Sequence, residues 1–280
     1  MKTQYLTSCS IGGLHKIAYT SWGEANNPNV LICSHGLTRN KHDFDVLAEK
    51  LSKKRRVICF DLPGRGESSW LNNKSSYNYT QYTVDALMTI ATSGVEQVDW
   101  LGSSMGGLLG MALSSMSNSP IRKLIINDVG PYIQKEALIR IAEYVGQQAH
   151  FDTAEELGLY MRTVYAGFGD LTDQQWDNML AFGQRTLDNG KLTLNHDPDI
   201  SRNFIDKPLD DIDLWTVWST IKQPVLVIQG ENSDLLSNEI SEKMTTTGPK
   251  ATRVIIPNTG HAPALMNKHD IGMIERWLGT

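Results

Sequence analysis

A serine framed by glycines constrains this chain more than any other feature. Residues 98–101 are typical of the end of a buried strand, residues 108–116 indicate an apolar helix, and Gly102-x-Ser104-x-Gly106 lies between them. A serine at such a sharp turn takes a strained backbone conformation, so small residues two positions before and after it are needed to avoid clashes. The turn lifts the hydroxyl clear of the sheet, and the free N–H groups of the helix start point to where an oxyanion would form. Ser104 is therefore the candidate nucleophile.

A nucleotide-binding loop is the competing interpretation of glycines at such a turn. A phosphate-binding loop needs Lys followed by Ser or Thr after its second glycine, whereas this chain continues with Leu108-Leu109. The glycine-rich stretch from Asp61 to Ser68 lacks the third glycine and the following helix of a dinucleotide fingerprint. We interpret that stretch as a structural turn, and we expect no nucleotide site.

The length and charge of the chain bound its class. At 280 residues it is typical of one α/β core that carries an insertion. A net charge of −5, with 40% hydrophobic and 20% charged residues, gives no electrostatic reason to expect nucleic acid or an anionic membrane as a partner. We expect a small neutral or apolar molecule instead.

The N-terminus and the cysteines indicate a cytoplasmic protein. The first eight residues lack the apolar run of a secretory signal, and no stretch approaches the length of a membrane span. Cys33 and Cys59 fall in expected buried strands and Cys9 leaves an odd number, so we predict reduced thiols and no disulfide scaffold. No Cys/His spacing resembles a metal site.

Alternating apolar runs and amphipathic stretches predict an α/β fold with a mostly parallel central sheet flanked by helices. Residues 3–9 and 14–22 are expected to form an antiparallel hairpin at its edge. Continuous apolar runs are typical of strands that are covered on both faces. The further strands expected on these grounds are residues 30–33, 56–61, 97–103, 121–128, 224–230 and 254–257.

The loop of residues 34–40 is the second informative place. If it follows a central parallel strand, its backbone N–H groups face the serine turn, and Gly36 permits the close approach that a transition-state oxyanion requires. We predict that the N–H groups of Leu37 and Met105 form the oxyanion hole. His35 is interpreted as a structural histidine that supports the loop, in preference to a catalytic group.

Four motifs, in order along the chain, resemble those of the α/β-hydrolase superfamily. They span the chain except for its middle third, and together they are highly specific for the fold. The reaction follows from them much less, because esterases, thioesterases, lactonases and carbon–carbon bond hydrolases share similar motifs. The motifs are His35-Gly36, Asp61-Leu62-Pro63-Gly64-Arg65-Gly66-Glu67-Ser68, Gly102-Ser103-Ser104-Met105-Gly106-Gly107 and Gly260-His261.

The resemblance implies a catalytic triad in the chain order serine, acid, histidine. His261 would take the Ser104 proton, and His269, the rival base, falls in or near the last helix with no glycine before it. Asp234, on a loop just beyond a strand end, is the favoured acid that holds the other ring nitrogen of the histidine. Asp128 is the alternative acid, because the resemblance includes hydrolases whose acid comes from that earlier position. It can equally belong to a turn that leads into the insertion.

The alternation of strand and helix stops in the middle third. Helical spacing, with capping residues at Thr153 and Thr172, predicts an all-helical insertion. Its position resembles the cap domain of many α/β-hydrolases, and we therefore divide the chain into a core of residues 1–132 and 213–280 and a helical cap of residues 133–212. Five aromatic residues of the cap are candidates for an apolar pocket, although the cap's own core is the favoured place for each: Tyr160, Tyr165, Phe168, Trp176 and Phe182.

These features together predict a serine hydrolase that cleaves small carboxylic esters through an acyl-enzyme, without a cofactor. A serine at position 104 argues against the dehalogenases and epoxide hydrolases of this fold, which use an aspartate there. Carbon–carbon bond hydrolysis stays open but is disfavoured, because no Gly-Pro-Gly-Ala run follows Gly36. Enol-lactone and thioester cleavage stay open as well.

A small-ligand receptor without catalysis is the alternative from another class. Such receptors occur on this fold, and their expected mark is the loss of a triad member, which this sequence does not show. A helical lid over the serine encloses a finite pocket, so we expect an enzyme that prefers short acyl chains.

Overall fold

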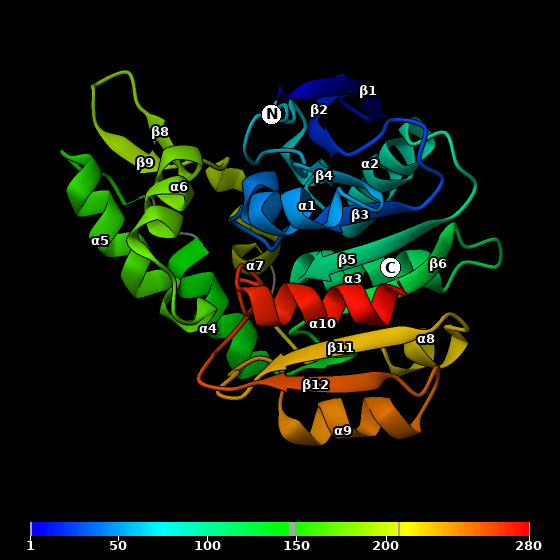
Figure 1. Ribbon diagram of the computed structural model, residues 1–280. Coiled ribbons are helices and arrows are strands. Elements are labelled where there is room, and N and C mark those ends of the chain that lie inside the picture. Colours follow the sequence, from blue (N-terminus) through cyan, green and yellow to red (C-terminus); the bar gives the residue numbers. More distant parts are fainter. Residues whose placement is uncertain (1, 146–148, 207, 280) are drawn as a thin grey trace.

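The core of the computed structural model is one eight-stranded sheet in the order β1-β2-β4-β3-β5-β6-β11-β12 (Figure 1). The structure describes residues 2–145, 149–206 and 208–279. The pairs β1-β2 and β2-β4 are antiparallel and the other pairs are parallel, which confirms the mostly parallel sheet predicted from the sequence. The strands are β1 (Gln4–Ser10), β2 (Gly13–Trp22), β3 (Val30–Ser34), β4 (Arg56–Phe60), β5 (Val98–Ser103), β6 (Ile121–Asn127), β11 (Val225–Gly230) and β12 (Thr252–Ile256).

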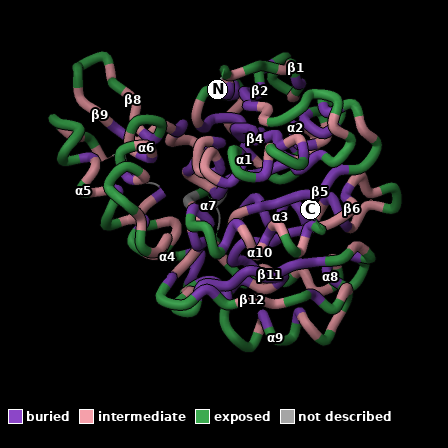
Figure 2. The backbone as a smooth tube through the Cα atoms, in the orientation of Figure 1, coloured by how far each residue is buried: buried purple, intermediate pink, exposed green. Residues whose placement is uncertain are grey.

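Helices cover both faces of the sheet. On one face, Leu47 and Ile274 bring α1 and α10 into a single apolar cluster with the sheet, and on the other face Leu109 and Trp218 do the same for α3 and α8. Every residue of β3 and β11 is buried, and Figure 2 shows the central strands in the colour of buried residues. Strands that are covered on both faces consist of such uninterrupted apolar runs. The helices are α1 (Asp45–Leu51), α2 (Tyr79–Thr92), α3 (Met105–Ser114), α8 (Trp215–Thr220), α9 (Asn238–Thr246) and α10 (Lys268–Leu278).

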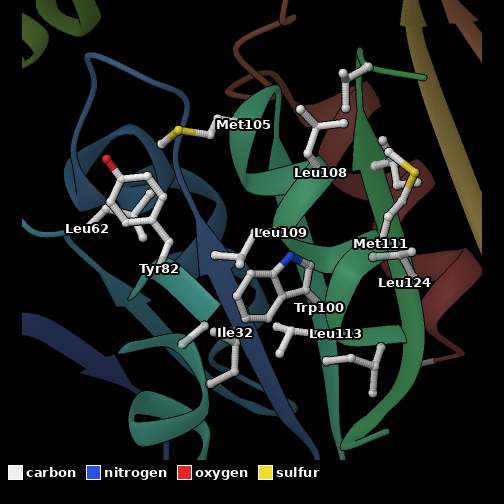
Figure 3. Close-up of a cluster of buried hydrophobic side chains, with 14 of the residues drawn as sticks. Ile32, Leu62, Tyr82, Trp100, Met105, Leu108, Leu109, Met111, Leu113 and Leu124 are labelled. Atoms are coloured by element: carbon white, nitrogen blue, oxygen red, sulfur yellow. The ribbon is translucent and has the colours of Figure 1, made fainter. Parts of the chain in front are cut away.

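Trp100 of β5 fixes how closely α3 lies against the sheet (Figure 3). Its side chain is fully buried, and its indole N–H donates to the carbonyl of Gly106 at 3.0 Å. A Cβ atom on Gly110 would lie 2.6 Å from the same indole ring. The glycines of α3 therefore let the helix approach Trp100, and this approach sets the position of the residues at the helix start.

Most of the chain between β6 and β11, up to β10, forms a separate layer of elements beside the sheet (Figure 1). We call residues 132–213 the cap segment. It begins with β7 (Tyr132–Ile133) and ends with β10 (Ile212–Asp213), which pair antiparallel, so the segment leaves and rejoins the core at one point. Between them lie α4 (Lys135–Val145), α5 (Ala154–Val164), α6 (Asp173–Gly183), β8 (Gln184–Thr186), β9 (Leu192–Leu194) and α7 (Arg202–Ile205).

The prediction that this insertion is all-helical is wrong for one part of it. β8 and β9 form an antiparallel hairpin whose loop contains Gly190 with a φ of +83°, a left-handed conformation that glycine adopts without strain. The Asn189-Gly190 pair is a turn signal of the kind that joins short strands. The predicted capping residues Thr153 and Thr172 do begin α5 and α6.

Short 3-10 turns complete the fold: η1 (Lys41–Phe44), η2 (Lys74–Ser76), η3 (Ala166–Phe168) and η4 (Pro198–Ser201).

None of the helices in the described ranges combines the length and the apolar character that crossing a membrane takes.

Candidate active site

Ser104 lies at the turn from β5 to α3 with φ 50° and ψ −114°, a left-handed conformation that is unusual for a residue with a side chain. The flanking glycines are required by close approaches. A Cβ on Gly102 would lie 2.0 Å from the carbonyl oxygen of Gly106, and one on Gly106 would lie 2.2 Å from that of Ser34. These contacts explain the spacing of the motif in the sequence. The predicted strained turn is confirmed.

His261 bridges Ser104 to a carboxylate. Its Nε2 lies 2.9 Å from the Ser104 hydroxyl oxygen, and its Nδ1 lies 2.8 Å from Oδ2 of Asp128. The histidine comes from the loop between β12 and α10, where Ala262 also has a positive φ of 59°. His269, the rival base of the sequence analysis, lies exposed on α10. The structure therefore joins Ser104, His261 and Asp128 into one hydrogen-bonded line.

Asp128 is held from several directions directly after β6. Its side chain is fully buried, and its backbone N–H donates to the carbonyl of Ile228 on the neighbouring strand at 2.8 Å. Besides His261, its carboxylate accepts from the N–H of Gly230 at 2.8 Å, the hydroxyl of Ser233 at 2.6 Å and the N–H of Ala262 at 3.1 Å. These donors fix the carboxylate toward His261.

The sequence-based choice of Asp234 as the acid is corrected by this geometry. The Asp234 side chain is 63% exposed, and its Oδ2 lies 3.1 Å from Nη2 of Arg140 on α4. The cause is the turn after β11, in which the Ser233 hydroxyl donates to Asp128 and accepts from the N–H groups of Leu235 and Leu236. Ser233 therefore faces the buried carboxylate, and the Asp234 carboxylate, one residue later, pairs with Arg140 instead.

Two backbone N–H groups near Ser104 are unused. Among the described residues, none accepts a hydrogen bond from the N–H of Leu37 or from that of Met105. A Cβ on Gly36 would lie 3.7 Å from the Ser104 Cβ, so the Leu37 loop lies against the serine turn. Both N–H groups are thus available to an oxygen bound at Ser104, and their role as an oxyanion hole stays a prediction.

His35 supports the loop that carries Leu37 through hydrogen bonds of both ring nitrogens. It is fully buried, its Nδ1 donates to the carbonyl of Gly36 at 2.6 Å, and its Nε2 accepts from the N–H of Leu62 at 3.0 Å. Burial, reinforced by the nearby positive charge of Arg65, lowers the pKa of His35 to about 3. A neutral ring with both nitrogens occupied supports the structural interpretation made from the sequence.

Sequence reasoning missed the part that Arg65 plays in the same loop. The side chain is fully buried, and its Nε donates to the carbonyl of Leu37 at 2.8 Å, while Nη1 donates to the carbonyl of Pro63 and the hydroxyl of Tyr82. The structural turn predicted for residues 61–68 therefore also orients the Leu37 peptide. An arginine inside a glycine-rich turn, next to apolar strands, is the only signal that the sequence offered.

A cavity of about 750 Å³ opens beside Ser104 and His261. The ends of the strands form one wall and the cap segment forms the other, with Leu138, Ile141 and Val164 among its apolar lining residues. Of the aromatic candidates, Tyr165 and Phe168 line the cavity, and they also pack in the cap's own cluster with Tyr160 and Trp176. Phe182 instead stacks on His42 with the ring centroids 3.5 Å apart.

Comparisons with known proteins agree with this architecture. A family model described as the alpha/beta hydrolase fold matches residues 29–267. The chain is 39% identical to a 3-hydroxybutyrate-oligomer hydrolase of Cupriavidus necator over 98% of this chain and 96% of the relative. It is 22% identical to the esterase YbfF of Escherichia coli over 87% of this chain and 90% of the relative. A solved alpha/beta hydrolase from Novosphingobium aromaticivorans superposes with a TM-score of 0.86 at 31% identity, covering 99% and 97% of the two chains. The relatives named above are hydrolases. The chain therefore belongs to the α/β-hydrolase family.

Proposed function

We propose that this protein is a serine esterase in which Ser104 is the nucleophile, His261 the general base and acid, and Asp128 the residue that orients His261. The hydrogen-bonded line from Ser104 through His261 to Asp128, at the wall of a cavity, is the observation that carries the proposal. Asp128 takes the role that the sequence analysis gave to Asp234, because its carboxylate accepts a hydrogen bond from Nδ1–H of His261.

The first half of the proposed reaction forms an acyl-enzyme. The Ser104 oxygen attacks the ester carbonyl carbon while His261 Nε2 takes the hydroxyl proton, and the carbonyl π electrons move onto oxygen. Collapse of this tetrahedral species breaks the bond to the alcohol oxygen, which receives the proton from His261. The negative charge of buried Asp128 stabilises the imidazolium that exists between these two steps.

The second half repeats the chemistry with water. His261 takes a proton from a water molecule that attacks the acyl carbon, and then returns it to the Ser104 oxygen as the carboxylic acid leaves. The unused N–H groups of Leu37 and Met105 are the donors for the oxyanion in both halves. Losing one such donor typically lowers turnover by about a hundredfold to a thousandfold.

Short hydroxyacyl esters, of which 3-hydroxybutyrate oligomers are the leading case, are the proposed substrates. The 39% identity over nearly the whole chain to a 3-hydroxybutyrate-oligomer hydrolase supports this class. A cavity of about 750 Å³ that the cap segment covers also favours short substrates, because a long acyl chain needs an open groove.

Labelling with a fluorophosphonate probe tests the nucleophile, since only an activated serine reacts. We expect mass spectrometry to find the adduct on Ser104 and to find none in Ser104→Ala. An adduct on another residue, or none on the wild-type protein, would contradict the assignment and would favour a binding protein without catalysis.

A substrate panel tests the class of bond. It comprises the 3-hydroxybutyrate dimer and trimer, a short p-nitrophenyl ester, a thioester, an enol lactone and a dienone. We expect the highest kcat/KM on the hydroxybutyrate esters. A higher kcat/KM on the thioester, the lactone or the dienone would replace the proposal with that reaction on the same three residues.

A further inference from the structure

The guanidinium groups of Arg39 and Arg140 line the cavity, and each is next to a different loop. Arg39 belongs to the loop that carries Leu37, whereas Arg140 projects from α4 of the cap segment to the loop after β11. Among the described residues that line the cavity, these two carry the permanent positive charges. An ester with a free carboxylate would need one of these two guanidinium groups to bind that carboxylate.

The positive charge of Arg39 is already paired with Asp43. Its Nε lies 3.1 Å from both carboxylate oxygens of Asp43, and its Nη2 contacts the same carboxylate. The guanidinium carbon also lies 4.7 Å from the ring centroid of Tyr165, and the side chain is only 5% exposed. A buried, bidentate pair is costly to break, so Arg39 is neutralised in place.

Arg140 retains unused donors. Its Nη2 donates to the carbonyl of Asp234 at 2.7 Å and lies 3.1 Å from the Asp234 carboxylate. Within the described part of the chain, no residue accepts from its Nε or Nη1. The two side chains are 46% and 63% exposed, and an exposed ion pair of this kind contributes little in water. A second carboxylate can therefore bind Arg140 without breaking a strong contact.

Arg140 lies on the side of Ser104 where the alcohol half of the ester would bind. His261 must give its proton to the alcohol oxygen, so the alcohol lies on the His261 side of Ser104, while the oxyanion faces Leu37 and Met105. The loop that Arg140 contacts adjoins the His261 loop, because the N–H of Asn232 donates to the carbonyl of Thr259 at 2.8 Å. Arg140 therefore lies toward the alcohol half.

We infer that Arg140 binds the free carboxylate of the alcohol half and so makes the enzyme selective for esters whose alcohol is itself a hydroxy acid. This inference rests on the proposed function. In a 3-hydroxybutyrate dimer, the alcohol released is 3-hydroxybutyrate, whose carboxylate lies a short distance from the cleaved bond. Binding of this carboxylate by Arg140 thus places the ester bond nearest the carboxyl end of an oligomer at Ser104.

Matched neutral substrates test the contact. The 3-hydroxybutyrate dimer is compared with its terminal primary amide, and 3-acetoxybutyrate with 3-acetoxybutyramide, on wild-type protein and Arg140→Gln. We expect the substitution to lower kcat/KM on each acid about tenfold to a hundredfold more than on the corresponding amide, the range for a hydrogen bond to a charged group. Arg162→Gln is the control, because Arg162 is also a cap arginine paired with an exposed aspartate, Asp173, and does not line the cavity.

The outcomes separate the two proposals. If wild-type protein cleaves the dimer and Arg140→Gln lowers kcat/KM equally on acid and amide, the carboxylate contact is wrong and the proposed function stands. If the dimer pair is not cleaved but the acetoxy pair shows the acid-specific loss, the hydroxyacyl class is wrong and the Arg140 contact stands. An equal loss in Arg162→Gln, or cleavage of neither pair by wild-type protein, overturns the inference.

Discussion

Replacing Asp128 with Asn is the sharpest test of which carboxylate orients His261. The substitution keeps the shape of a fully buried side chain and removes its charge. The asparagine oxygen is expected to remain toward His261, because that position accepts from three donors, while the new NH₂ group faces the N–H of Gly230. The imidazolium then loses its counter-charge. Comparable substitutions in serine hydrolases lower kcat about ten-thousandfold, which corresponds to about 5 kcal/mol in the barrier.

The matched variant is Asp234→Asn, assayed with the same neutral short p-nitrophenyl ester so that no substrate carboxylate is involved. Asp234 is exposed and pairs with Arg140, so we expect its kcat/KM to stay within about twofold of wild type, as surface substitutions usually behave. Thermal unfolding of both variants separates misfolding from lost chemistry. A large loss in Asp234→Asn with a small one in Asp128→Asn would refute the orientation argued here for His261.

Three further predictions follow from single features of the structure. Ser104→Gly is expected to unfold at a higher denaturant concentration than Ser104→Ala, because glycine relieves a backbone strain of about 1–3 kcal/mol at φ 50°; equal midpoints would contradict this. The folded pKa of His35, about 3, lies below its ordinary 6.5, so the unfolded chain binds more protons between these values and stability falls as pH drops through this window. We expect that acid slope, measured by denaturant unfolding, to be shallower in His35→Gln, and an unchanged slope would exclude His35 as its source. Among p-nitrophenyl esters, kcat/KM is expected to rise by up to about fourfold per methylene, the equivalent of about 0.8 kcal/mol of binding free energy, and then to fall once the cavity is filled. A rise that continues through long chains would show an open groove.

Local geometry made part of the site predictable from the sequence. The spacing of Gly102, Ser104 and Gly106 reflects two close backbone approaches: Gly102 lies against the Gly106 carbonyl within the turn, and Gly106 lies against the Ser34 carbonyl at the end of β3. Side chains larger than hydrogen are excluded at both positions, so the motif indicated the backbone of the turn. His261 was found through the resemblance, from the Gly260-His261 motif in the loop after the last strand. The fold was predictable because strands buried on both faces need uninterrupted apolar runs.

The acid was not predictable on the same grounds. Asp128 and Asp234 both follow strands, and these strands, β6 and β11, are neighbours in the sheet. Which carboxylate faces His261 depends on the direction of one turn, set by the hydrogen bonds of Ser233, and no periodicity records that direction. The cap segment was harder still, because helical spacing identifies an apolar face without identifying the neighbour that covers it.

The short pairing of β7 with β10 bears on how this enzyme can diverge. Ile133 lies opposite Ile212 and Tyr132 opposite Asp213, so the chain exits and re-enters the core side by side. Closing a loop between adjacent ends costs an entropy that grows only slowly with loop length. Insertions of different length can therefore replace the cap segment between β7 and β10, while the turns and loops that hold Ser104, Asp128 and His261 stay unchanged. The proposed selectivity and the proposed chemistry are thus encoded in separable stretches of the chain.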